Sequence, residues 1–183
     1  MHYFRRLPGL ALLLLGLFTL PGVARAQELY TYTAGVLGGV GGSFDVSPGN
    51  DYGNRDLQLN LGVITEPHTL VSLRAGKLSL DRKGLFGTLS NADLTYATLA
   101  GEYRMQQSYY DSGVFLGFGG YRLRGDRGGR DRGQTSIGLT AGATAEFRVN
   151  RFLGVLLELS GHYVNLDEAK VYGMLQGGLS VRF

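Results

Sequence analysis

The sequence predicts an all-β protein, an eight-stranded antiparallel up-and-down transmembrane β-barrel preceded by a cleavable signal peptide. Three observations predict this fold. The amino terminus is basic and then apolar, the rest of the chain alternates apolar with small or polar residues, and short connections alternate with longer ones.

The first 26 residues have the organisation of a signal peptide. Arg5 and Arg6 precede an apolar run at 10–20, and Ala24 and Ala26 provide small residues for cleavage. The residues around the arginine pair favour the general secretory route over a twin-arginine signal. We therefore expect cleavage after Ala26, which leaves residues 27–183 as a single transmembrane barrel domain.

Composition limits the partners of this mature chain. Of the 18 Lys and Arg residues, Arg5, Arg6 and Arg25 leave with the signal, so 15 remain against 15 Asp and Glu. The pI near 9.2 therefore gives no indication of nucleic-acid binding. Cysteine is absent, which excludes disulfides and thiolate metal sites, and we expect no cofactor and no metal.

Period-two alternation predicts eight strands, because residues i and i+2 of a strand share one face. In 135–149, one face carries Ile137, Leu139 and Phe147, whereas the other carries Ser, Gly, Thr, Glu and Arg. Comparable runs occupy 29–44, 57–66, 69–77, 94–105, 113–123, 152–163 and 171–183. The run at 113–123 leaves the outward face undecided, since both of its faces mix Gly with large apolar residues.

The connections give the barrel its orientation. Those at 45–56, 78–93, 124–134 and 164–170 are polar and mostly long, whereas those at 66–68, 106–112 and 150–151 are short. Outer-membrane barrels have short periplasmic turns and longer outer loops. The alternative, a soluble sandwich or lipocalin-like barrel, is disfavoured because the polar face has few charges, as suits a narrow interior.

The last strand carries a family resemblance. Its sequence GGLSVRF, ending at Phe183, resembles the carboxyl-terminal signature of the small outer-membrane barrels, of the OmpA transmembrane-domain, OmpX and opacity-like types. The resemblance implies that Leu179, Val181 and Phe183 form an assembly signal read by the barrel-assembly machinery. It also implies location in the bacterial outer membrane, where lipids and lipopolysaccharide surround a barrel that we expect to be a monomer.

Six ionisable residues are predicted to face the lumen. They are Arg74, Glu102, Arg104, Glu146, Arg148 and Glu158. An eight-stranded barrel is just wide enough for side chains to fill, so we expect these charges to pair as a neutral Arg–Glu plug. The alternative is a gated, narrow channel for small solutes.

A hydroxyl, an imidazole and a carboxylate occur together on one face of the seventh strand, as Ser160, His162 and Glu158. These are the parts of a hydrolytic triad, and an alternative function is therefore a lipid-modifying enzyme of the lipid A deacylase type. In-line residues of a strand lie about 6–7 Å apart, too far for a relay, so we expect no enzymatic activity.

Two further groups of residues are predicted to lie at the membrane boundaries. Arg124, Arg127, Arg130 and Arg132 belong to an outer loop suited to anionic surfaces. Interfacial aromatic girdles are expected from Tyr30, Tyr32, Tyr103, Phe147, Phe152 and Phe183 at one end and from Phe44, Tyr121 and Tyr163 at the other. The sequence thus favours a structural or surface-interaction role through the outer loops.

Overall fold

The computed structural model describes residues 31–44, 51–80, 90–127, 130–167 and 169–183. Within the strands, the side chains of residues 51–52, 90–91, 127 and 130–132 are outside this description. The predicted signal peptide, its cleavage site and Tyr30 also lie outside the described residues. In the part of the chain that is described, no helix is long and apolar enough to cross a membrane.

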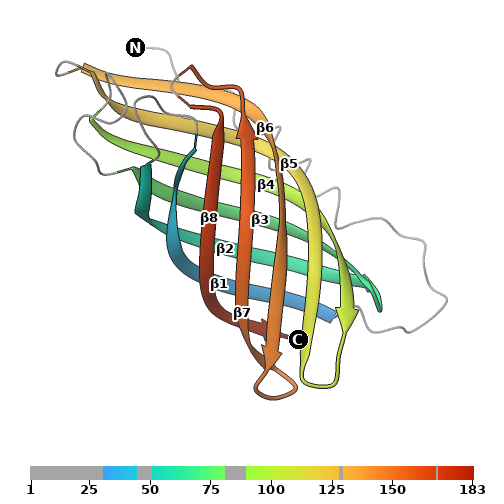
Figure 1. Cartoon of the computed structure of the whole chain (residues 1–183). Coiled ribbons are helices and arrows are strands. Elements are labelled where there is room, and N and C mark those ends of the chain that lie inside the picture. Colours follow the sequence, from blue (N-terminus) through green and yellow to red (C-terminus); the bar gives the residue numbers. More distant parts are fainter. Residues whose placement is uncertain (1–30, 45–50, 81–89, 128–129, 168) are drawn as a thin grey trace, which may run out of the picture.

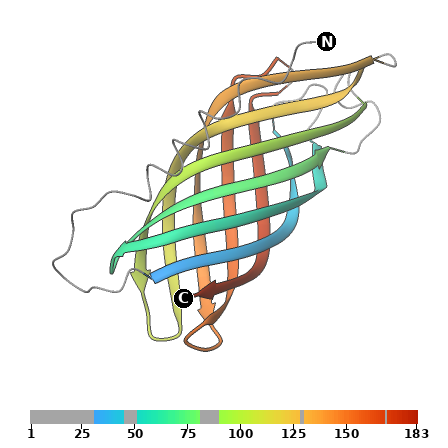
Figure 2. The same ribbon diagram turned by 180° about the vertical axis from the view of Figure 1, so that it is seen from behind.

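Eight antiparallel strands form a closed barrel, as the alternation predicts (Figures 1 and 2). Each strand pairs with its neighbour in sequence, and β1 closes the barrel against β8. The strands are β1 Thr31–Ser43, β2 Asp51–Glu66, β3 Thr69–Leu80, β4 Ser90–Gln106, β5 Tyr110–Arg127, β6 Arg130–Arg148, β7 Leu153–Val164 and β8 Val171–Arg182. The expected eight-stranded antiparallel up-and-down β-barrel is therefore confirmed.

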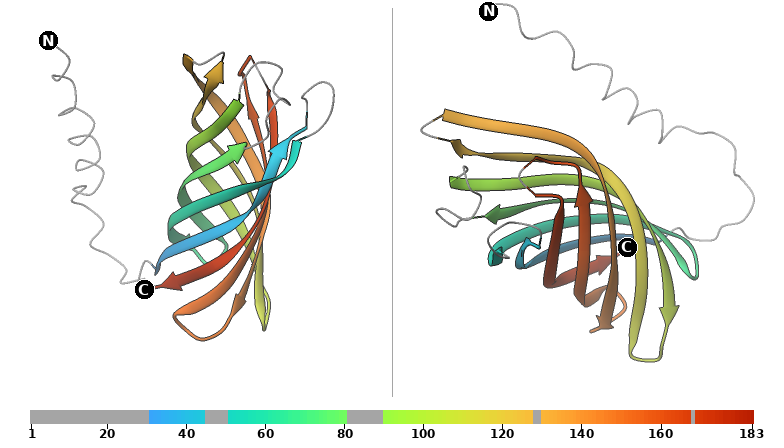
Figure 3. Two further views of the ribbon diagram at one scale, coloured as in Figure 1. Left: turned by 90° about the vertical axis from the view of Figure 1, so that its left-hand side faces the viewer. Right: turned by 45° about the horizontal axis from the view of Figure 1, so that its top comes forward.

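Several strands extend beyond the expected bounds, most clearly β5 and β6. Their ladder is continuous from Tyr110 opposite Phe147 to Arg127 opposite Arg130, so most of the loop predicted at 124–134 is strand. This extension rises at the end of the barrel opposite the carboxyl terminus (Figure 3). Alternation underestimated these strands because backbone hydrogen bonds continue where the side chains cease to be apolar.

Alternate residues face outward and inward around the barrel. Large apolar side chains such as Leu61, Leu116 and Leu159 are exposed on the outer face. The structure defines the outward face of the fifth strand, which the sequence left undecided. Val114, Leu116 and Phe118 face outward, and Phe115 faces inward. An apolar exterior is what a bilayer requires of a barrel wall.

The girdle prediction is correct for most aromatics and wrong for one. Exposed rings near the carboxyl-terminal end belong to Tyr32, Tyr103, Phe147, Phe152 and Phe183, and those near the opposite end belong to Phe44 and Tyr163. Tyr121 is only 1% exposed because it belongs to the inward face of β5. The mixed composition of that strand concealed its orientation in the sequence.

The interior toward the loop end differs from the polar lumen that the sequence suggested. A cluster of buried, mostly apolar side chains fills it, including Leu78, Leu94, Tyr172 and Met174. This cluster is called the apolar cap below, and its full membership is Leu78, Leu80, Ala92, Leu94, Tyr96, Tyr121, Leu123, Val164, Leu166, Ala169, Tyr172 and Met174. The strands therefore enclose a packed core at this end.

The seam between β1 and β8 includes the chain terminus. Phe183 and Tyr32 exchange backbone hydrogen bonds, at 3.0 Å from the Phe183 nitrogen and 2.8 Å from the Tyr32 nitrogen. Their rings stack with centroids 6.1 Å apart. Gly178 permits close strand approach, since an added Cβ would overlap the Val36 carbonyl oxygen.

Candidate functional site: the charged lumen

Three strands contribute the first group of buried charges. Glu102 on β4 accepts a hydrogen bond from Arg74 Nη2 at 2.9 Å and another from Arg104 Nε at 3.0 Å. Thr144 Oγ1 donates to the same carboxylate at 2.8 Å. Arg74 on β3 also reaches Glu158 on β7 at 3.4 Å, which joins opposite walls of the barrel.

The second group lies nearer the carboxyl-terminal end of the barrel. Glu146 accepts from Arg182 Nη2 at 2.6 Å and is 3.0 Å from Arg104 Nη1, which links it to the first group. Arg182 also donates to Asp111 at 2.8 Å, and Arg148 is paired with the same carboxylate. The charges therefore form one connected lumen network rather than separate pairs.

Five of the six predicted lumen charges are buried. The exception is Arg148, whose side chain is 39% exposed at the edge of the network. Asp111 and Arg182 complete the network but are not among the six residues predicted from the sequence. The sequence placed Asp111 in a turn. Extending the β5 alternation from Gly113 by two residues toward the amino terminus places Asp111 on the inner face.

Burial makes this network energetically demanding. Each ion removed from water carries a penalty of several kcal/mol, which is offset only by well-placed partners. Arg74 has two carboxylate partners, and its guanidinium carbon also lies 3.5 Å from the Phe115 ring centroid. Such arrangements fix the relative positions of strands, because a strand that shifted would leave a buried charge without its partner, in surroundings of low dielectric constant.

A layer of polar side chains separates the lumen network from the apolar cap. Tyr96 Oη donates to Gln58 Oε1 at 2.7 Å, and Gln58 Nε2 donates to Glu158 Oε1 at 3.1 Å. Gln176 on β8 donates to Asp56 on β2, across the intervening strand β1. A layer of amide, carboxyl and hydroxyl groups therefore lies between the lumen network and the apolar cap.

Ser160 and His162 contact one another, contrary to the distance argument from the sequence. His162 Nε2 lies 3.2 Å from Ser160 Oγ, because the long imidazole side chain leans along the strand. His162 Nδ1 lies 2.9 Å from the Tyr121 hydroxyl, whereas Glu158 is engaged by Arg74 and Gln58. The pair thus has a phenol where a hydrolytic triad has a carboxylate.

The predicted arginine loop is largely a β-hairpin end. Arg124 is exposed on β5, and the backbone of Arg132 pairs with that of Gly125. Arg127 and Arg130 are backbone partners at the last described rung, and the side chains of Arg127, Arg130 and Arg132 lie outside the described residues. The ladder brings the four backbone positions close together in space.

Among the residues that the structure describes, no group of three or more His, Asp or Glu side chains is arranged to hold a metal ion. The buried carboxylates instead contact arginine, amide or hydroxyl groups.

Comparisons with known proteins identify the fold. No protein-family model and no curated protein sequence matches the chain. Among solved structures, Neisserial surface protein A is 18% identical with a TM-score of 0.69, covering 84% of this chain and 97% of that one. The amino-terminal barrel of Pseudomonas aeruginosa OprF is 14% identical with a TM-score of 0.60, covering 84% and 97%.

A third similar structure is Ail, the attachment invasion locus protein of Yersinia pestis. It is 17% identical with a TM-score of 0.55, and the match covers 82% of this chain and 98% of that one. All three are small β-barrels of bacterial outer membranes. At these identities the likeness establishes the fold, and it is the fold that the sequence resemblance implied.

Proposed function

We propose that this chain, a closed eight-stranded barrel of the outer-membrane type, is an integral outer-membrane protein with a plugged lumen that acts through its outer strand ends. The observation that carries this proposal is that two successive groups of buried side chains occupy the interior. The lumen network joins β3 to β7 through Arg74 and Glu158, and the apolar cap occupies the interior beyond it. An interior filled in this way favours a scaffold over a conduit.

Outer-membrane location is supported by the outward face of the strands. Exposed leucines, valines and phenylalanines cover the wall, and aromatic rings occur toward both ends. The predicted signal peptide and the carboxyl-terminal Phe183 agree with this location. Fractionation of cells producing the full chain should recover it in the outer membrane with residues 1–26 removed; recovery in the soluble periplasm would contradict the proposal.

Planar-bilayer recording tests the plugged lumen. The wild-type barrel should give no stepwise conductance, because the lumen network and the apolar cap close the axis in series. Glu102→Ala and Glu146→Ala should also remain closed, since the apolar cap is unaffected. Asp93→Ala is the surface control, because Asp93 pairs with Lys77 on the outer face. Opening by either lumen variant alone would favour the alternative of a gated channel.

The proposed surface interaction uses the β5–β6 end, where the ladder brings together the backbone positions of Arg124, Arg127, Arg130 and Arg132. Guanidinium groups pair bidentately with sulfate, phosphate and carboxylate, so an anionic polysaccharide is the expected ligand class.

The test uses purified barrels in detergent with heparin as the sulfated probe. The wild type should be retained and released by salt, whereas replacing the four arginines by Gln should abolish retention. Arg151→Gln is the matched control, because Arg151 is exposed in the turn at the opposite end. Equal retention of the four-Gln variant would show that another surface binds.

The second candidate function is a lipid-modifying enzyme, and the contact between Ser160 and His162 is the observation that favours it. Both side chains are buried in the lumen, and the ring nitrogen away from Ser160 faces Tyr121 rather than a carboxylate. We therefore rank this function below the scaffold. Mass spectrometry of lipid A from cells producing the wild type or Ser160→Ala decides it; a Ser160-dependent loss of an acyl chain would establish catalysis.

A further inference from the structure

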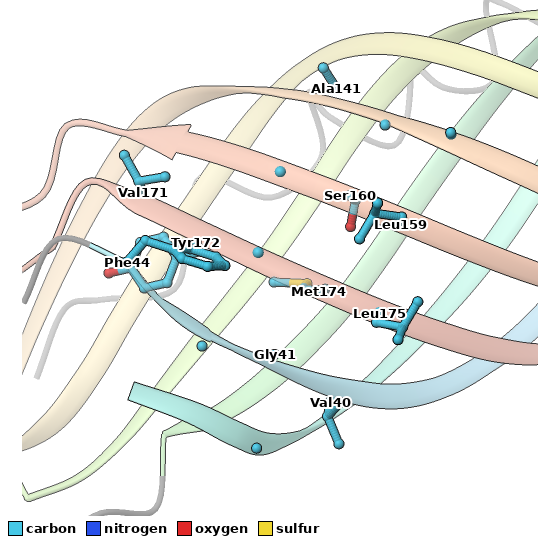
Figure 4. A pocket seen from close by; sticks show the side chains of 16 residues that line it. Val40, Gly41, Phe44, Ala141, Leu159, Ser160, Val171, Tyr172, Met174 and Leu175 are labelled. Carbon is cyan, nitrogen blue, oxygen red and sulfur yellow. The ribbon is translucent and has the colours of Figure 1, made fainter. Parts of the chain in front are cut away.

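A groove crosses the outward face of β6, β7, β8 and β1. Its volume is about 670 Å³, within the roughly 300–1,000 Å³ of small-molecule sites. The outward side chains that line it include Val40, Phe44, Ala141, Leu159, Val171 and Leu175. Phe44 and Val171 lie at one end, and Val40 and Leu175 lie at the other (Figure 4).

The groove exists because paired positions on neighbouring strands lack large side chains. Ala141 is the register partner of Gly161, Gly161 is the partner of Gly173, and Gly173 is the partner of Gly42. Elsewhere the same face carries leucines and valines that stand out from the wall. Phe44 folds over Gly173, where an added Cβ would overlap its ring, and this contact closes one end of the groove.

A cation lies beside the opposite end. Arg55 on β2 is the register partner of Val40, and both side chains are exposed on the outer face. None of the residues that line the groove is acidic, and no ion pair of Arg55 occurs among the described residues. An apolar groove with a guanidinium at its edge is complementary to an acyl chain that carries a phosphate headgroup.

We propose that this groove seats one acyl chain of a phosphate-bearing lipid from the surrounding bilayer, with the phosphate at Arg55. The inference rests on the proposed membrane location, because only a lipid-facing wall meets acyl chains. Transfer from bilayer to groove gains no hydrophobic energy, so selectivity comes from shape and from the guanidinium contact. A second copy of the chain fits less well, because in a two-fold dimer the same concave surface would face itself.

Native mass spectrometry of the full barrel, released from nanodiscs of phosphatidylcholine and phosphatidylglycerol, tests this proposal. The wild type should retain one lipid, with phosphatidylglycerol preferred, because the phosphate of phosphatidylcholine already has a choline cation beside it whereas that of phosphatidylglycerol does not. Gly161→Leu should abolish retention, because its side chain fills the groove. This substitution is compatible with folding, since the nearest atom to an added Cβ is the Ala141 carbonyl oxygen at 3.9 Å.

Two controls separate the groove from the wall as a whole. Ala97→Leu places the same leucine side chain on the outward face of β4, away from the groove, and should retain lipid as the wild type does. Arg55→Gln should keep one lipid but lose about tenfold in preference for the anionic headgroup, the typical effect of one charged hydrogen bond. Arg122→Gln, on the outward face of β5, should leave that preference unchanged.

Several outcomes would overturn the proposal. Equal lipid retention by Gly161→Leu and the wild type would place the lipid elsewhere, and a dimer mass lost in Gly161→Leu would assign the groove to a second copy. Binding of free glycerol phosphate as strong as that of the lipid would exclude a role for the chain. Circular dichroism of the same nanodiscs reports whether the barrel is inserted and folded, so a failure of membrane insertion is distinguished from a failure of the groove.

Discussion

Removing one charge from the lumen network should destabilise the barrel far more than removing one from its outer surface. Glu102→Gln keeps the size of the side chain but loses the negative charge that Arg74 and Arg104 share. Both guanidiniums would then meet a neutral amide in a buried position, with Glu158 at 3.4 Å and Glu146 at 3.0 Å as their remaining partners. Breaking a buried pair in this way costs about 3–5 kcal/mol.

Equilibrium unfolding in urea, with the barrel in lipid vesicles and circular dichroism as the signal, measures this difference. The matched control is Asp93→Asn, which breaks the ion pair with Lys77. The side chain of Asp93 is 38% exposed and that of Lys77 is 53% exposed. Such a surface pair contributes about 0–1 kcal/mol. If the free energy of unfolding fell no further in Glu102→Gln than in Asp93→Asn, the lumen would behave as a hydrated space and not as a plug.

Three other substitutions test separate parts of the structure. Tyr96→Phe leaves Gln58 Oε1 without the donor that lies at 2.7 Å, and should reduce the free energy of unfolding by about 1–3 kcal/mol; an unchanged urea midpoint would contradict the buried polar layer. Gly178→Ala should prevent closure of β1 against β8, since its Cβ would overlap a backbone oxygen, whereas Gly161→Ala should close normally; the heat-dependent shift of folded barrels in electrophoresis distinguishes them. Phe183→Ala loses the ring contact with Tyr32, which is worth about 0.5–1.5 kcal/mol. The variant should still fold from urea into detergent, but its yield in the outer membrane of cells should fall. An unchanged cellular yield would contradict the assembly role.

Much of the barrel was predictable because strand alternation is a local property. The positions of Arg74, Glu102 and Glu146 on the inner face follow from counting by two along their own strands. Counting by two failed where both faces of a strand had a similar composition, and where a strand extended past its apolar part. Tyr121 was assigned to the outer wall for the first reason, and Asp111 was left in a turn for the second.

Side-chain reach was a separate source of error. The spacing of Ser160 and His162 gives the separation of their backbones, but the imidazole spans most of it and makes a contact at 3.2 Å. The same spacing does not reveal that Tyr121, 41 residues earlier, approaches the other ring nitrogen. Chemistry inside a narrow barrel depends on what the opposite wall contributes.

The sequence by itself determined that this is a barrel with an apolar exterior and a charged interior, because period-two alternation requires no knowledge of which strands meet. Only the tertiary structure decided that Arg74 would join Glu158 across 84 residues, and that Ala141, Gly161 and Gly173 would align into one groove. Both depend on register and barrel closure. Those are set by all eight strands together, so no single strand encodes them.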